Sequence, residues 1–151
     1  MTFSIVARSS DGESWGVAVA SKFLAVGAVV PAAVAEVGAI ATQADANVAY
    51  KGIALAHLDE GATAPVALQR LLEEDEGRDD RQVGIVDVDG NAASHTGHAC
   101  IEWAGGVIGE GRRTVRSERA HGLCNIKRTT ENDRVRQSTT EGASVVLCRL
   151  L

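Results

Sequence analysis

The stretch Thr2–Ser21, TFSIVARSSDGESWGVAVAS, decides how the fold begins. Residues 2–9 alternate as a strand does: Phe3, Ile5 and Ala7 point one way, and Thr2, Ser4, Val6 and Arg8 the other. The Asp11-Gly12 pair is a strong hairpin turn signal. Residues 15–21 are apolar at both alternating positions, so we expect a returning strand that is buried on both faces. The sequence therefore predicts an antiparallel hairpin at the centre of the fold.

Further strands and two helices are predicted along the first 111 residues. Residues 25–43 are β-branched and punctuated by glycine, and they predict two strands with a break near residues 36–38. A helical pattern follows over residues 47–58, and a second helix begins after Thr63 as its N-cap. Residues 81–88 and the Gly-rich residues after them predict more strands. This order is typical of an α+β domain with helices packed against a sheet.

Length and composition favour one soluble domain. The 151 residues are 45% hydrophobic but only 3% aromatic, so small aliphatic side chains must form the core. The longest apolar stretch, residues 24–35, is too short to span a bilayer, and the N-terminus lacks the pattern of a signal peptide. Three cysteines without a CxxC motif (Cys100, Cys124 and Cys148) favour a reducing compartment. We therefore expect a cytoplasmic protein with no membrane partner.

The charge changes sign near residue 111. Residues 1–110 carry 6 Lys and Arg against 16 Asp and Glu, a net charge of −10. Residues 111–151 carry 9 against 4, a net charge of +5. A basic tail can indicate nucleic-acid binding, but this one lacks interleaved aromatic residues, so we expect no nucleic-acid partner. We predict a domain over residues 1–111 and an anomalous tail over residues 112–151.

Five blocks of the chain, in this order, resemble the DUF1028 family: MTFSIVAR (1–8), GVAVASKFLAVGAVVPAA (16–33), GAIATQADAN (38–47), RQVGIVDVDGNAASHTG (81–97) and WAGGVIGEG (103–111). That family is placed with the N-terminal nucleophile (Ntn) hydrolases. The resemblance therefore implies an αββα sandwich of the Ntn-hydrolase type, a candidate nucleophile at Thr2 and the cleavage of amide bonds.

The resemblance stops where the composition and the charge change, although family members continue with more of the sandwich. We therefore predict a truncated sandwich with exposed strand edges and an unburied sheet face. A reading-frame slip near the codons of residues 109–113 would explain the coincidence. Translation of the underlying DNA in the two other frames tests this hypothesis, because one of them should restore family-like sequence.

Thr2 becomes the first residue when a methionine aminopeptidase removes Met1, as it does before small residues. Its α-amine, with a pKa of about 7.7–8.0, is then a base on the same residue as the hydroxyl nucleophile. This mechanism needs partners for the amine. Ser21 is the candidate hydrogen-bond partner, and Lys22 is the candidate nearby cation. The alternatives are that Thr2 is an ordinary strand residue and that Lys22 is a snorkelling surface lysine.

Candidate oxyanion and substrate contacts lie later in the chain. Thr42 and Gln43 close a predicted strand, and Asn47 opens the first predicted helix. A helix N-terminus and an amide side chain can both face a developing negative charge. The alternative for Asn47 is a helix cap. Asp45 stands where family members often carry a bulkier residue, which bears on the shape and charge of the pocket.

No metal or other cofactor is expected. His95, His98 and Cys100 are metal-binding residue types, but their spacing is weak and a fourth ligand is not evident. The glycine-rich GGVIGEG segment lacks the Lys-Ser/Thr pair of a phosphate-binding loop.

The function we expect is hydrolysis of a small amide or peptide. The sequence leaves open whether the chain forms a homo-oligomer. The alternatives are a non-catalytic binding or assembly subunit that keeps the fold, and an inactive truncated product.

Overall fold

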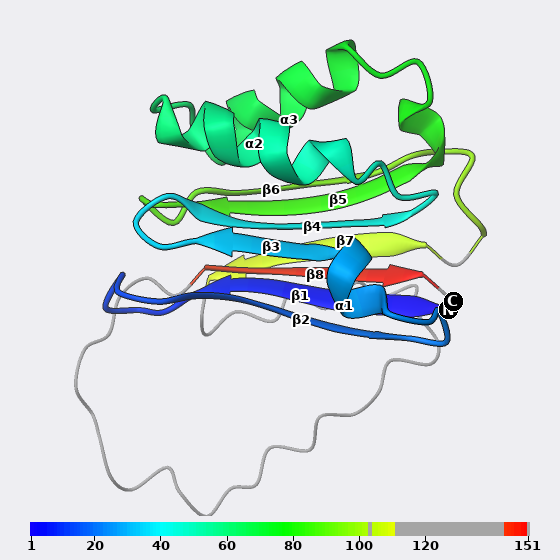
Figure 1. Ribbon diagram of the computed structural model, residues 1–151, viewed down its shortest axis with the longest axis horizontal. Coiled ribbons are helices and arrows are strands. Elements are labelled where there is room, and N and C mark those ends of the chain that lie inside the picture. The colour runs from blue at the N-terminus through cyan, green and yellow to red at the C-terminus, as the bar shows by residue number, and fades with distance from the viewer. Residues whose placement is uncertain (103, 111–143, 151) are drawn as a thin grey trace, which may run out of the picture.

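A computed structural model describes residues 1–102, 104–110 and 144–150. The described chain forms two four-stranded antiparallel sheets, which stack face to face (Figure 1). Sheet A has the strand order β2-β1-β8-β7, and sheet B has the order β3-β4-β5-β6. The strands are β1 (Thr2–Arg8), β2 (Trp15–Ser21), β3 (Pro31–Val34), β4 (Gly38–Ala44), β5 (Arg81–Asp87), β6 (Ala92–Thr96), β7 (Gly105–Glu110) and β8 (Ser144–Leu150).

The two longer helices lie on one side of this pair of sheets. These helices, α2 (Ala49–Asp59) and α3 (Ala64–Glu73), cover the outer face of sheet B (Figure 1). The short α1 (Val26–Val29) and the 3-10 turn η1 (Arg78–Asp80) complete the described elements. Among the described residues no helix packs on the outer face of sheet A, and none is long and apolar enough to cross a membrane. The expectation of an α+β domain with helices against a sheet is confirmed.

The N-terminal hairpin forms, but it does not lie at the centre of the fold, because β2 is an edge strand of sheet A. Strands β1 and β2 pair antiparallel in a register that sets Thr2 opposite Ser21, and the intervening turn uses Gly12 at φ 76°. The expectation that residues 15–21 are buried on both faces is wrong, because Gly16, Ala18 and Ala20 are exposed. The physical reason is that these three residues point to the outer face of sheet A, which no described element covers, whereas Val17 and Val19 point to the cluster between the sheets.

The predicted pair of strands over residues 25–43 is partly right. The break near residues 36–38 exists, with Glu36 at φ 62° and Gly38 at φ 153°. The first strand begins only at Pro31, because residues 26–29 form α1. Both predicted helices are present within two residues of their expected starts.

Two apolar clusters build the core, and they lie on opposite faces of sheet B. The cluster between the sheets includes Val6, Ala39, Ala41, Val86 and Val146. The cluster under the helices includes Ile40, Leu58, Leu68, Leu71 and Ile85. Alternate residues of β4 and β5 therefore point to different clusters, which is the period-two rule of a strand buried on both faces.

Strand β8 comes from the predicted tail and lies between β1 and β7 in sheet A. It packs against Gly84 of sheet B, where an added Cβ would lie 2.7 Å from Val146 Cγ1 and 3.2 Å from Cys148 Sγ. Burial raises the pKa of the Cys148 thiol to about 12. Part of the segment expected to be anomalous is therefore an inner strand of the described sheet. The rest of that tail, residues 112–143 and 151, lies outside the described residues.

Candidate functional site

Two hydrogen bonds between the sheets show which strand ends meet. Trp15 Nε1, at the end of the hairpin remote from the N-terminus, donates to Asp87 O at 3.3 Å. Gln82 Nε2 donates to Gly105 O at 3.1 Å, and Gly105 lies level with Phe3 across β8. The N-terminal end of β1 therefore faces the part of sheet B where β4 ends and β5 begins (Figure 1).

Thr2 is the first residue of β1, and its side chain is partly buried. Its Oγ1 lies 3.0 Å from Ser21 Oγ, the hydroxyl of the residue paired with it in β2. Ser21 Oγ also donates to Met1 O at 3.1 Å and accepts the backbone N–H of Phe23 at 3.0 Å. Because the single Ser21 proton goes to Met1 O, the Thr2 hydroxyl is the donor in the Thr2–Ser21 contact.

Lys22 follows Ser21 and has an exposed side chain. Its neighbours Phe23 and Leu24 are also exposed, at 63% and 89%. Lys22 is thus the sequence neighbour of Ser21, whose hydroxyl contacts Thr2. Its role as a cation near the Thr2 amine stays a prediction.

Thr42 and Gln43 are both buried in β4, at 0% and 1% exposure, but they lie on opposite faces of sheet B. Ala39 and Ala41 belong to the cluster between the sheets and Ile40 to the cluster under the helices, so the alternation places Gln43 between the sheets and Thr42 towards the helices. Of these two candidates, Gln43 shares the inter-sheet layer with Thr2.

Gln43 continues into a short ladder of buried polar side chains. Its Nε2 donates to Gln82 Oε1 at 2.7 Å, and Gln82 Nε2 donates to Thr96 Oγ1 at 2.9 Å as well as to Gly105 O. These side chains cross β4, β5 and β6 at the end of the sandwich nearest Thr2. Ser4, two residues after Thr2 on the same face of β1, is also buried, at 1% exposure.

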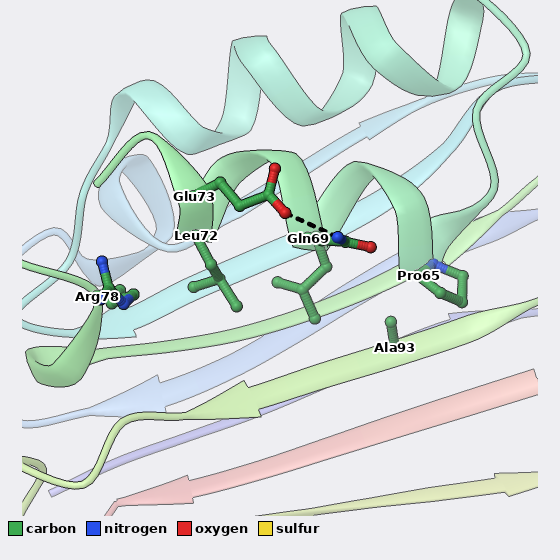
Figure 2. A pocket seen from close by; sticks show the side chains of 7 residues that line it. Pro65, Gln69, Leu72, Glu73, Arg78 and Ala93 are labelled. Carbon is green, nitrogen blue, oxygen red and sulfur yellow. Dashed lines mark hydrogen bonds between the residues drawn. The ribbon is translucent and has the colours of Figure 1, made fainter. Parts of the chain in front are cut away.

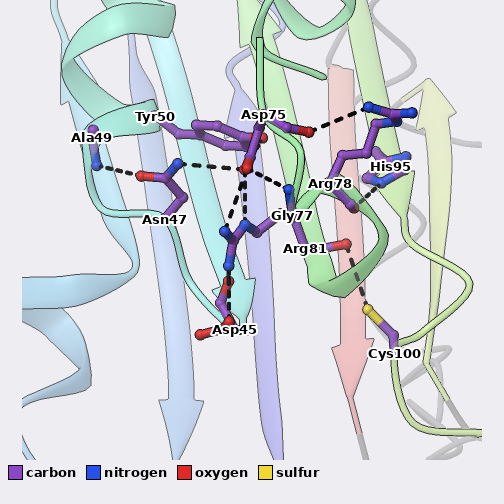
Figure 3. Close-up of polar contacts among 10 residues, drawn as sticks. All are labelled: Asp45, Asn47, Ala49, Tyr50, Asp75, Gly77, Arg78, Arg81, His95 and Cys100. Atoms are coloured by element: carbon purple, nitrogen blue, oxygen red, sulfur yellow. Dashed lines mark hydrogen bonds and ion pairs between the residues drawn. The ribbon is translucent and has the colours of Figure 1, made fainter. Parts of the chain in front are cut away.

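Asn47 is engaged at the start of α2. Its Oδ1 accepts the backbone N–H of Ala49 at 3.1 Å, and its Nδ2 donates to Asp75 Oδ2 at 3.4 Å (Figure 3). The N-cap residue of α2 is Val48, without a side-chain capping hydrogen bond, so Asn47 lies one residue before the expected cap position. A contact of Asn47 with a substrate stays a prediction.

Asp75 is the centre of the polar network around Asn47 (Figure 3). It accepts hydrogen bonds from Tyr50 Oη at 2.7 Å and from Arg81 Nε at 2.9 Å, and Arg81 Nη1 lies 3.0 Å from Asp45 Oδ2. The Arg81 guanidinium holds the pKa of Asp75 far below its usual range. Burial first, and then the hydrogen bond to Asp75, raises the pKa of Tyr50. The network joins the start of α2 to β5 by way of the loop after α3.

The three metal-binding residue types of the sequence have separate partners. His95 Nε2 meets Arg78 O at 2.8 Å, His98 Nδ1 lies 3.1 Å from Asp79 Oδ1, and Cys100 Sγ donates to Arg81 O at 3.5 Å (partly drawn in Figure 3). Within residues 1–102, 104–110 and 144–150, no group of three or more His, Cys, Asp or Glu is placed to hold a metal ion.

An open groove of about 690 Å³ lies elsewhere, between α3 and β6 (Figure 2). Its apolar floor includes Leu68, Leu72 and Ala93, and its rim carries a hydrogen bond from Gln69 Nε2 to Glu73 Oε1 at 2.7 Å. None of the candidate residues Thr2, Ser21, Lys22, Thr42, Gln43 and Asn47 lines it. The groove is therefore separate from the site at the N-terminal end of β1.

Sequence reasoning missed Ser4, Gln82 and Thr96. The signal for Ser4 was its place on the Thr2 face of an alternating strand, and the signal for Gln82 was an uncharged polar residue next to the apolar run of residues 83–86. Neither signal shows which residues of distant strands meet. Within the acidic run over residues 73–80, the Asp75 side chain is only 13% exposed because it is paired with Arg81.

Comparison with known proteins adds a family and a fold. The family of unknown function DUF1028 matches residues 2–115. The crystal structure of protein SPO2555 from Silicibacter pomeroyi, described as DUF1028, superposes with a TM-score of 0.71 at 24% identity. The alignment covers 99% of this chain and 53% of that one, so the chain spans about half the length of this solved relative. Among curated proteins, none matches the chain.

Proposed function

The chain belongs to the DUF1028 family, a family of unknown function, and we propose that it is an N-terminal-nucleophile amidohydrolase acting on a small amide or peptide. In this proposal the two sheets and their helices are the part of an Ntn-hydrolase-type sandwich that presents Thr2. The observation that carries the proposal is the 3.0 Å contact between Thr2 Oγ1 and Ser21 Oγ at the end of the inter-sheet layer.

The proposed reaction begins after Met1 has been removed. The free α-amine of Thr2 takes the proton of the Thr2 hydroxyl, and Oγ1 attacks the carbonyl carbon of the substrate amide. The amide C–N bond breaks, the leaving amine takes that proton, and the acyl group remains as an ester on Oγ1. Water then hydrolyses the ester, which releases the acid and restores Thr2.

Ser21 has a defined part in this proposal. Its hydroxyl donates to Met1 O in the described chain, and that acceptor leaves together with Met1. The Ser21 donor then becomes available to the new Thr2 amine, while Phe23 N–H still holds the Ser21 oxygen in place. Lys22 follows directly and supplies a positive charge that favours the free amine over the ammonium.

An intact mass spectrum, followed by covalent labelling, tests the proposal. Protein expressed without an N-terminal tag should lack one methionine, and a β-lactone electrophile should add to it with a stoichiometry near one. Thr2→Ala should abolish labelling, and Thr2→Ser should retain it because the hydroxyl remains. Thr63→Ala is the matched control, since it removes an exposed threonine whose side chain makes no capping hydrogen bond.

Retention of Met1, or equal labelling of the Thr2→Ala variant, would contradict the proposed mechanism. Absence of labelling in folded protein that has lost Met1 would instead favour the binding or assembly subunit. A melting curve without a cooperative transition would favour the inactive product.

A further inference from the structure

The ladder of buried amides between the sheets ends in an acceptor without a partner. Gln43 is 1% exposed and Gln82 is fully buried. Gln43 Nε2 is engaged with Gln82 Oε1, whereas Gln43 Oε1 has no hydrogen-bond partner among the described residues. Burying a polar atom without a partner is unfavourable, so such an atom in a folded protein calls for an explanation.

The orientation of both amides follows from a backbone carbonyl. Gly105 O can only accept, so the Gln82 group facing it must be Nε2, which donates at 3.1 Å. Gln82 Oε1 therefore faces Gln43, and only the Gln43 amide nitrogen can donate to it. The atom left over at the end of the ladder is then Gln43 Oε1, which can only accept and needs an N–H or O–H donor.

Ser4 adds a second open position in the same layer. Its Oγ is buried and, within the part of the chain that the structure describes, has no hydrogen-bond partner. Ser4 lies on the same face of β1 as Thr2, and its Cα pairs with that of Cys148, beside which Gly84 brings sheet B close. The unpartnered Ser4 hydroxyl and the unpartnered Gln43 Oε1 thus both belong to the layer between the sheets, and Thr2 lies at the end of that layer.

Five polar side chains of the inter-sheet layer near the N-terminal end of β1 are neutral. Thr2, Ser4, Gln43, Gln82 and Thr96 carry no charge, and the Gln43 acceptor would repel the lone pairs of a carboxylate. We propose that Gln43 Oε1 and Ser4 Oγ bind a carboxamide group of the substrate, with Gln43 accepting its N–H and Ser4 donating to its oxygen. This inference rests on the proposed function and deepens it, because it names the chemical class of substrate and predicts rejection of the acid product.

A matched pair of probes tests the inference on the full chain. Acetamide and acetate have nearly the same shape, but only acetamide offers N–H donors to Gln43. Nuclear magnetic resonance titration of the Gln43 side-chain amide signal should show saturable binding of acetamide in the millimolar range. Acetate should bind at least about tenfold more weakly, because it leaves Gln43 Oε1 facing another acceptor.

Two variants locate the binding. Gln43→Leu should weaken acetamide binding at least about tenfold, and Ser4→Ala should weaken it by a smaller factor, as expected for the loss of one hydrogen bond each. Gln69→Leu removes a glutamine from the exposed face of α3 and should leave the affinity unchanged. The wild-type comparison of acetamide with acetate decides the matter if Gln43→Leu does not fold.

Equal binding of both probes, or no binding of acetamide, would overturn the inference. A high-resolution crystal structure in which one buried water occupies the position and acetamide does not displace it would also overturn it. The titration is repeated on Thr2→Ala, which lacks the nucleophile. If this variant binds acetamide but the wild type is not labelled by the electrophile, the binding site stands and the proposed catalysis is wrong. If the wild type is labelled but binds acetamide no better than acetate, the proposed catalysis stands and the carboxamide site is wrong.

Discussion

At the scale of single residues, Ala44 is one of three described non-glycine residues with a positive φ. It ends β4 with φ at 69°, in the left-handed region that an alanine Cβ disfavours. It also follows Gln43 and precedes Asp45, whose carbonyl accepts from Arg81 Nη1 at 2.7 Å. The contacts on both sides therefore hold the strained residue, as is common near functional sites.

Ala44→Gly should raise the free energy of unfolding by about 0.5–1 kcal/mol. Glycine adopts a positive φ without the Cβ clash, and this gain exceeds the extra entropy of the unfolded glycine chain. Urea unfolding at pH 7 measures the change. Ala33→Gly, an exposed β3 alanine without a positive φ, is the control and should lower stability. A loss of stability in Ala44→Gly as large as in the control would contradict this account.

At the scale of elements, a residue of strand β5 caps the N-terminus of α3. Thr63 is the N-cap residue, as predicted, but its side chain makes no capping hydrogen bond. Instead the carboxylate of Asp87, at the end of β5, accepts the N–H of Ala64 at 2.8 Å. Asp87 Oδ1 also accepts the backbone N–H of Asn91 at 2.8 Å in the β5–β6 turn. One buried carboxylate thus joins a helix start to a strand turn.

Asp87→Asn should lower the free energy of unfolding by about 2 kcal/mol, because an amide has a single acceptor oxygen and must leave either Ala64 or Asn91 N–H unpartnered. Thermal denaturation followed by circular dichroism measures the loss. Asp89→Asn, in the same turn but exposed, should change the melting temperature little. If both variants melt alike, Asp87 does not cap α3.

The Asp75 network predicts a pH dependence. Arg81 is the main cause that holds the pKa of the Asp75 carboxyl below its usual value. The stabilisation by the Asp75 charge is therefore complete above the unfolded-state pKa of about 3.9 and is lost as the pH falls through the lowered folded-state pKa. Asp75→Asn should therefore lower the free energy of unfolding by about 2 kcal/mol at pH 7, which is about the contribution of a hydrogen bond to a charged group. The loss should become progressively smaller below pH 4.

Urea unfolding at pH 7 and at pH 3 measures the effect of Asp75→Asn. Asp59→Asn at the exposed end of α2 is the control for a general change in charge. A cost that stays constant between the two pH values would show that Asp75 acts without its charge.

At the scale of the whole molecule, β8 completes sheet A from the far end of the sequence. It pairs on one side with β1 and on the other with β7, and Val146 and Cys148 are buried against sheet B. Without β8, the buried positions Val6 and Ser4 of β1 would lose a neighbouring strand. The described fold therefore depends on residues that the sequence places in a basic, aperiodic tail.

Alkylation of cysteine tests the placement of β8. Because Cys148 is buried and its thiol pKa is raised to about 12, iodoacetamide at pH 8 should label it at least about 100-fold more slowly in folded than in urea-denatured protein. Cys100, which is only partly buried, serves as the internal comparison. Mass spectrometry of the separate peptides gives both rates, and equal rates at Cys148 would mean that β8 is not docked.

Much of the fold could be predicted from local patterns. The alternation of residues 2–9, the Asp11-Gly12 turn and the helix start at Thr63 each lie within one element or one turn. The errors fall where the neighbours of an element decide the outcome. The apolar β2 is exposed on one face because no described element covers the outer face of sheet A, and the first part of residues 25–43 forms α1 before β3 begins.

The candidate site divides in the same way. The contact of Thr2 with Ser21 could be predicted, because a hairpin register joins residues that are near in sequence. The partnership of Gln43 with Gln82, and the proximity of both to the Thr2 end, could not, because residues 39 apart meet only through strand order and sheet stacking.

The sequence by itself determined the N-terminal hairpin, the two helices and their order, since local alternation, turn residues and helix signals fix these over short distances. The tertiary structure alone decided that β8 enters sheet A, that Asp87 rather than Thr63 caps α3, and that buried amides line the layer behind Thr2. Those features depend on which strands become neighbours. That choice is made by the burial of whole faces, a property no single segment carries.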